Sequence, residues 1–262
     1  MRAMRAETVS VTRVTPSQRD TMFDLMSQYY DCMSRERFDQ DLDAKDDVIL
    51  LLDDESGVVK GFSTLKTIET EVDGRTIRAL FSGDTVVDKE YWGQRVLGKE
   101  FLKYLFIQKA KHPFSSFYWM LISKGYKTYL LLANNFNEYY PRYEEETPPA
   151  YQRVLDKVSG ELFGDCYDSQ TGVIVFKESL GKLKEGIADV PCDAALQNPR
   201  IQFFAERNPG WADGAELACL AKMTWSMPFY YAVKSWWKLI GRRWLSEAES
   251  QVQVPVVREK EA

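Results

Sequence analysis

The chain has 262 residues, of which 45% are hydrophobic and 28% are charged, a balance typical of a soluble globular protein. Its 34 basic and 39 acidic residues give a formal net charge of −5, which argues against a general nucleic-acid-binding protein because such a protein needs a basic face. Four dispersed cysteines and a single histidine, His112, argue against a disulfide framework, a metal centre and a Ser-His-Asp hydrolase. Because the N-terminus has no apolar core and no apolar run reaches ~20 residues, we expect a cytoplasmic protein without a membrane span.

The first elements are a strand and two helices. Residues 8–14 alternate apolar and polar side chains, which predicts a half-buried strand. A helix follows, with Thr15 as its cap and Pro16 in its first turn, and its apolar residues recur at helical spacing. The stretch "RERFDQDLDAK" predicts a second, short helix.

Three strands come next, and then helices alternate with strands. "DVILLL", "VVKGFSTLKTIETEV" and "RTIRALFSGDTVV" predict an antiparallel meander, with Asp73-Gly74 as a hairpin turn. A helix over 93–111, a buried strand at "SFYWMLIS", a helix from "GYKTYLLL" and a last core strand at "GVIVFK" follow. The order predicts an α/β fold of the α+β type, whose mixed sheet contains two parallel strands joined by the central helix.

Residues 178–245 form a C-terminal extension that is partly helical and rich in aromatic residues. "NPRIQFFAERNPG" predicts a short helix and "AELACLAKM" an extra strand. Residues 228–245 have an apolar stripe opposite a basic one, which fits a membrane-surface helix, a lid over an acyl chain or, as we favour, a helix packed on the domain. The polar tail 246–262 is predicted to be disordered.

The order of elements over residues 7–177, with "TVVDKEYWGQRVLGKEFL" at its centre, resembles the GNAT superfamily of acyl-CoA-dependent N-acyltransferases. In that family a loop of the form [Q/R]-x-x-G-x-[G/A] joins a strand to a helix, and the loop amides and helix N-terminus bind the pyrophosphate of the cofactor. In one register Trp92 takes the Arg/Gln position, and in another Arg95 to Gly98 match R-x-x-G. The resemblance therefore implies that 1–177 is an acyltransferase domain with a GNAT-like fold, and that the cofactor-binding residues are Val86, Val87, Trp92, Gly93, Gln94, Arg95, Val96, Leu97, Gly98 and Lys99.

The resemblance also implies transfer of an acyl group from a thioester to the amine of a small molecule. The donor would be acetyl-CoA or a longer acyl-CoA. Acyl carrier protein is an alternative, because "WMLISKGYKTYLLL" is similar to the branch that makes N-acyl amino acids. A protein that binds acyl-CoA without turnover, or a thioester hydrolase, would be a different reading of the same pattern. The acceptor and the oligomeric state stay open.

Four side chains are candidates for the chemistry. Asp84 lies on the strand before the loop, where a carboxylate could take the amine proton or anchor an ammonium group. An ion pair or a turn cap would be its structural alternative. The general acid of the family is a tyrosine on the helix after the next strand, and here Tyr126, Tyr129 and Tyr140 compete for that role, although each could equally line the core.

Overall fold

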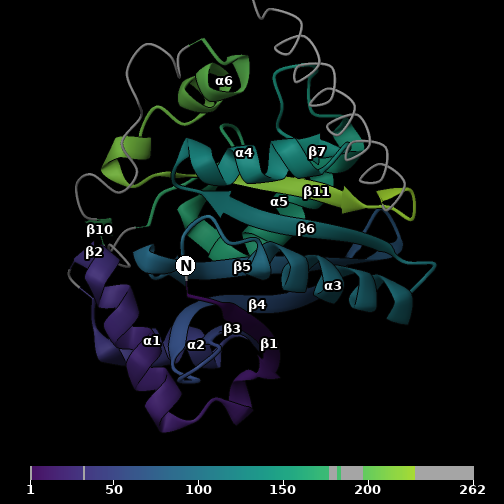
Figure 1. Ribbon diagram of the computed structural model, residues 1–262. Coiled ribbons are helices and arrows are strands. Elements are labelled where there is room, and N and C mark those ends of the chain that lie inside the picture. The colour runs from purple at the N-terminus through teal and green to yellow at the C-terminus, as the bar shows by residue number, and fades with distance from the viewer. Residues whose placement is uncertain (1, 32, 177–181, 184–196, 228–262) are drawn as a thin grey trace, which may run out of the picture. The chain divides into compact units, whose positions relative to one another are not determined.

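The computed structural model describes residues 2–31, 33–176, 182–183 and 197–227 (Figure 1). Residues 1–223 form one compact unit, and 224–262 form a second, of which only 224–227 are described. The expected helix over 228–245 and the tail 246–262 lie outside the described residues. In the part that is described, no helix has the length and apolarity needed to cross a membrane.

The N-terminal half follows the expected order. Thr15 and Gln18 form a reciprocal capping box that starts the first helix, with Pro16 at its first position. Asp73 and Gly74 both have positive φ, 52° and 70°, as a tight hairpin turn requires. The elements are β1 (Met4–Ser10), α1 (Pro16–Tyr29), β2 (Tyr30–Asp31), α2 (Arg35–Asp43), β3 (Asp47–Asp53), β4 (Val59–Val72) and β5 (Arg75–Val87).

The C-terminal half completes the sheet. The central helix, α3, starts at Val96 rather than at residue 93, because residues 89–91 form a separate short 3-10 turn. The elements are α3 (Val96–Lys111), β6 (Ser116–Ser123), α4 (Tyr126–Asn135), β7 (Tyr139–Tyr140), α5 (Pro149–Phe163), β8 (Tyr167–Asp168), β9 (Val173–Ile174), β10 (Lys182–Leu183), α6 (Pro199–Arg207) and β11 (Glu216–Met223).

The main sheet has the strand order β1-β3-β4-β5-β6-β11-β9-β8, and β7 also pairs with β11 (Figure 1). Strands β5 and β6 are parallel and are joined by α3, whereas β1, β3, β4 and β5 are antiparallel neighbours. A mixed sheet with the GNAT-like order of elements is therefore confirmed.

The C-terminal strands differ in detail from the expectation. The last core strand expected at "GVIVFK" is only two residues long, and the neighbour of β6 is β11, from the stretch assigned to the extension. The extra strand expected there is confirmed. The division at residue 177 stays a prediction, and the sheet itself extends beyond it.

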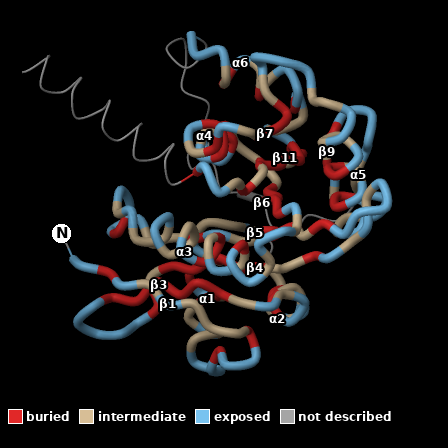
Figure 2. The backbone as a smooth tube through the Cα atoms, turned by 90° about the vertical axis from the view of Figure 1, so that its right-hand side faces the viewer, coloured by how far each residue is buried: buried red, intermediate tan, exposed pale blue. Residues whose placement is uncertain are grey.

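Helices cover both faces of the sheet. On one face α1 and α2 bury Met22, Leu25 and Phe38 against β3 and β4, and α5 packs beside them on β5 and β6 through Val154, Leu155 and other apolar residues. On the opposite face α3 and the end of α4 contact Trp119 of β6 through Phe101 and Phe136, with ring centroids 4.8 and 5.0 Å apart. Buried residues consequently follow the strands and the inner sides of the helices (Figure 2).

Candidate active site

A β-bulge in β5 is the central feature of the site. Ser63 pairs with Thr85 and Leu65 with Ser82, so that two residues of β5, Gly83 and Asp84, lie opposite the single Thr64 of β4. Gly83 is required there, because a Cβ atom would lie 2.6 Å from the Thr64 hydroxyl oxygen. The extra residue reverses the alternation of side chains, and for this reason Val86 joins Phe81 on the face that α1, α2 and α5 cover.

Beyond the bulge, β5 has an edge that pairs with no described strand. The parallel pairing of β5 with β6 ends at Ser82, while β5 continues along β4 to Val87. The Asp88 N–H donates to the Lys60 carbonyl at 2.8 Å, and backbone groups of an antiparallel strand point alternately to its two sides. The N–H and C=O of Val87 therefore face away from β4. We call this side of residues 83–87 the open edge of β5.

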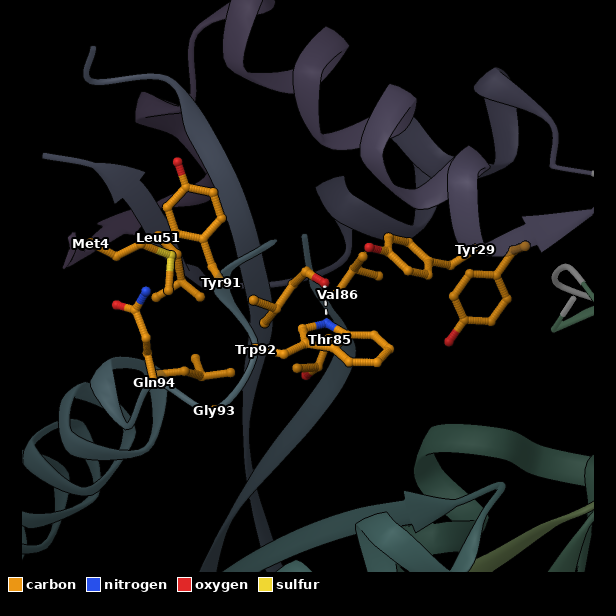
Figure 3. Close-up of a pocket in the computed structure, with 12 residues that line it drawn as sticks. Met4, Tyr29, Leu51, Thr85, Val86, Tyr91, Trp92, Gly93 and Gln94 are labelled. Atoms are coloured by element: carbon orange, nitrogen blue, oxygen red, sulfur yellow. Dashed lines mark hydrogen bonds between the residues drawn. The ribbon is translucent and has the colours of Figure 1, made fainter. Parts of the chain in front are cut away.

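The indole of Trp92 occupies part of the open edge. Its Nε1–H donates a hydrogen bond of 2.8 Å to the Val87 carbonyl (Figure 3). The ring also stacks on Tyr29, with centroids 6.4 Å apart and an interplanar angle of 30°. Trp92 thus joins the loop after β5 to the end of α1.

A pocket of about 330 Å³ adjoins the open edge, between β5, the loop that follows it and the end of α1. Six of the predicted cofactor-binding residues line it, namely Val86, Val87, Trp92, Gly93, Gln94 and Leu97. The other four, Arg95, Val96, Gly98 and Lys99, are on the adjacent start of α3, outside the lining. Tyr29 and Tyr30 also line the pocket, and the sequence analysis did not identify them as site residues.

The start of α3 is suited to an anion. Arg95 is its cap residue and makes no side-chain capping hydrogen bond, and no acidic residue lies in the first turn. The first amides of a helix have no partner within the helix and carry a partial positive charge. Arg95 and Lys99 are exposed beside them. Gly93, with φ of 84°, provides the turn that joins Trp92 to this helix.

Hydrogen bonds, one of them buried, anchor the loop to the N-terminal part of the chain. The Tyr91 hydroxyl donates to Asp53 Oδ2 at 2.6 Å, and the backbone N–H of Ser56 donates to Asp53 Oδ1 at 2.8 Å. These donors hold the pKa of Asp53 well below its usual range, with Tyr91 making the larger contribution. The Gln94 side chain donates to the Arg2 carbonyl at 2.8 Å. The residues on both sides of Trp92 and Gly93 are therefore fixed.

Asp84 lies in a cluster of charged side chains beside the pocket. Burial, followed by the charge of Asp41 and a hydrogen bond with it, raises the pKa of Asp84 to about 7, although Lys45 opposes the shift. Lys45 itself donates to Asp41 at 2.5 Å, so that its charge is shared. The side chain of Asp84 is half-buried, and its carboxyl group can hold or lose a proton near neutral pH.

A second carboxyl group, which sequence reasoning missed, belongs to the same cluster. Burial raises the pKa of Glu216, the first residue of β11, to about 7, and Lys124 Nζ lies 3.8 Å from it. The negative charges of Asp84 and Glu216, after burial, raise the pKa of Tyr30. Since Tyr30 also lines the pocket, it connects the pocket with both carboxyl groups. In the sequence, Glu216 stands at the start of an apolar strand, and no local pattern distinguishes it from an ordinary surface carboxylate.

The three candidate tyrosines have different surroundings. Tyr129 is fully buried and donates to the Pro141 carbonyl at 3.0 Å, and burial raises its pKa. Tyr140 donates to Glu145 at 2.8 Å, and its pKa is also raised, first by burial and then by that bond. Tyr126 begins α4, just after the end of β6 at which β5 and β6 separate. The hydroxyls of Tyr129 and Tyr140 thus have partners, and Tyr126 is the candidate closest along the chain to the open edge.

Among the described residues, no group of three or more His, Cys, Asp and Glu side chains could hold a metal ion. No family model and no curated protein matches the sequence. Several solved structures are similar to parts of the chain. A protein from Enterococcus faecalis described as a probable N-acyltransferase is 19% identical, with a TM-score of 0.39 over 50% of this chain, and the match spans only 32% of that protein.

Two further similar structures are described as acetyltransferases. Glucosamine-6-phosphate N-acetyltransferase from Arabidopsis thaliana is 16% identical over 45% of this chain and 81% of its own, with a TM-score of 0.33. A GNAT family N-acetyltransferase from Escherichia coli, in complex with CoA, is 16% identical over 53% of this chain and 77% of its own, with a TM-score of 0.36. Likeness at this level assigns no function, which depends instead on the residues of the site.

Proposed function

We propose that the chain is an acyltransferase that moves an acyl group from a CoA thioester to the amine of a small molecule. The observation that supports this most directly is the bulge in β5. It turns Asp84, whose pKa is about 7, toward the charged cluster, next to a strand edge and a pocket suited to an extended thioester.

The donor would bind along the open edge of β5 and the start of α3. The pantetheine arm of CoA is an extended chain with two amide groups, and an open strand edge offers backbone groups that pair with amides. The phosphates would meet the helix N-terminus, Arg95 and Lys99. A guanidinium such as that of Arg95 donates in a fork that matches a phosphate, whereas Lys99 offers a point charge.

The carboxyl cluster would prepare the acceptor. An ammonium group cannot attack a thioester, so one proton must first pass from the amine to a base. Asp84 can accept this proton near neutral pH, and Glu216 has the same property. The neutral nitrogen then forms a bond to the thioester carbon, and the C–S bond breaks. The CoA thiolate leaves and takes up a proton, while the nitrogen gives up its second proton to solvent and the amide forms. Tyr126 is our candidate donor of that proton.

Release of free thiol tests the proposal. The purified chain is incubated with acetyl-CoA, a long-chain acyl-CoA or an acylated acyl carrier protein, each with and without a mixture of small amines. We expect thiol release that depends on the amine, and loss of at least ~10²-fold of the rate in Asp84→Asn. Glu71→Gln on β4 is the matched control, because Glu71 is an exposed strand carboxylate, and it should keep the full rate.

Other outcomes would contradict the proposal in recognisable ways. Release at the same rate without any amine would identify a thioester hydrolase. Tight binding of acyl-CoA with no release would identify a binding protein. Release with the acylated carrier protein alone would retain acyl transfer and reject CoA as the donor.

A further inference from the structure

Trp92 has an unusual position for a large aromatic side chain. It is 53% exposed, and therefore gains little from burial, yet it lies in the wall of the pocket. Its hydrogen bond to Val87 and its contact with the Tyr29 ring hold it there. A single hydrogen bond and a ring contact of this kind contribute little net stability, so the indole can leave at low cost.

Trp92 donates its hydrogen bond to the same backbone carbonyl, that of Val87, which an extended ligand would use. The Val87 carbonyl faces away from β4 and is the last acceptor of the open edge before the loop. An amide N–H of a pantetheine arm lying along β5 would donate to this carbonyl as a neighbouring strand does. Because the indole N–H already donates to it, the indole and the arm compete for the same carbonyl and for the same space in front of it.

We propose that Trp92 is an internal competitor for the donor arm and thereby sets the affinity and selectivity of the site. This inference rests on the proposed function. A ligand that carries a pantetheine arm must displace the indole from Val87, whereas a ligand that contacts only the start of α3 need not. The turn at Gly93 and the anchors at Tyr91 and Gln94 confine the movement to the Trp92 side chain.

Trp92→Phe tests the competition directly, because phenylalanine keeps an aromatic ring against Tyr29 and lacks the N–H group. Dissociation constants are measured by calorimetry for pantetheine, for CoA and for the nucleotide part of CoA without the arm. We expect the variant to bind pantetheine and CoA roughly two- to tenfold more tightly, since one competing hydrogen bond is lost, and to bind the nucleotide part with unchanged affinity. Trp225→Phe, at another exposed tryptophan, is the control and should change none of the three.

A second measurement uses the unaltered chain. The indole protons are observed by NMR with nitrogen-15 labelling, and the Trp92 signal is assigned by its absence from the Trp92→Phe spectrum. We expect pantetheine to shift this signal and to speed its exchange with solvent, because the bond to Val87 is replaced.

Failure of the inference differs from failure of the proposed function. Equal affinities of both proteins for pantetheine, or a Trp92 indole signal that pantetheine does not change while it binds, would overturn the inference alone. Equal tightening for all three ligands would also overturn it, because the effect would not depend on the arm. No binding of CoA or pantetheine to either protein would overturn the proposed function and the inference together.

Discussion

The folded state disfavours the negative charge of Asp84, and replacement of Asp84 by asparagine should reveal the size of this effect. The pKa of the carboxyl group is about 7 in the fold, against an ordinary value of 3.8. Between these two pH values the folded state binds more protons than the unfolded state, so the stability of the protein falls as the pH rises. The loss of stability is complete above pH 7, and it is absent below the ordinary pKa of 3.8, where the carboxyl group is protonated in both states.

The magnitude follows from the difference in pKa. Each tenfold change in proton affinity corresponds to about 1.4 kcal/mol, which gives an upper bound of about 4 kcal/mol for Asp84. Because the carboxyl group is half-buried and keeps some contact with water, we expect about 2 kcal/mol. Asparagine has a similar shape and cannot ionise, so the Asp84→Asn variant should lack this part of the pH dependence.

The assay is urea denaturation of both proteins at about pH 4 and about pH 8. We expect the stability of Asp84→Asn relative to the original chain to increase by about 2 kcal/mol between the two pH values, while acyl transfer is lost. Glu71→Gln, at an exposed carboxylate of β4, is the control variant in the same measurements. A constant difference between Asp84→Asn and the original chain at both pH values would refute the raised pKa, and with it the assignment of Asp84 as a base at neutral pH.

Three further predictions concern the rest of the site. Tyr126→Phe should slow turnover by ~10²-fold with little change in the Kd for CoA, and equal turnover would exclude Tyr126 as the general acid. Arg95→Ala should weaken CoA binding by about 1.5–3 kcal/mol in calorimetry and leave pantetheine binding unchanged, whereas equal affinity for CoA would make Arg95 a bystander. Tyr91→Phe removes the main hydrogen bond that lowers the pKa of Asp53. Its Tm at pH 7 should fall, and it should lose less stability than the original chain between pH 5 and pH 2, a difference that thermal denaturation at several pH values would detect or disprove.

Local patterns in the sequence predicted most of the fold. The capping residue Thr15 and the turn at Asp73-Gly74 each act through neighbouring backbone atoms, and both are confirmed. Helix α5 was missed, although Pro149 stands at its start and apolar residues recur at helical spacing within it. The sequence therefore carried a local signal for this helix.

The site was predictable only in part, since long-range contacts create it. Asp84 could be identified from its place on the strand before the loop, but the bulge that turns it depends on the close approach of Gly83 to Thr64 of β4. Glu216 joins the cluster from a strand far along the chain. The occupation of the Val87 carbonyl by Trp92 depends on the loop geometry. No local feature of the sequence predicts these contacts between distant residues.

Strand β11 has a consequence for how the protein is made. Residues 217–223 pair with residues 117–123 of β6, so that Met223 meets Phe117 about a hundred residues after Phe117 has been synthesised. At ~5–20 residues per second, β6 waits roughly 5–20 s on the ribosome with one long, apolar edge exposed. Edges of this kind pair readily with other chains. The growing polypeptide is therefore most prone to aggregation during this interval. Molecular chaperones that bind apolar segments would be most useful at this stage.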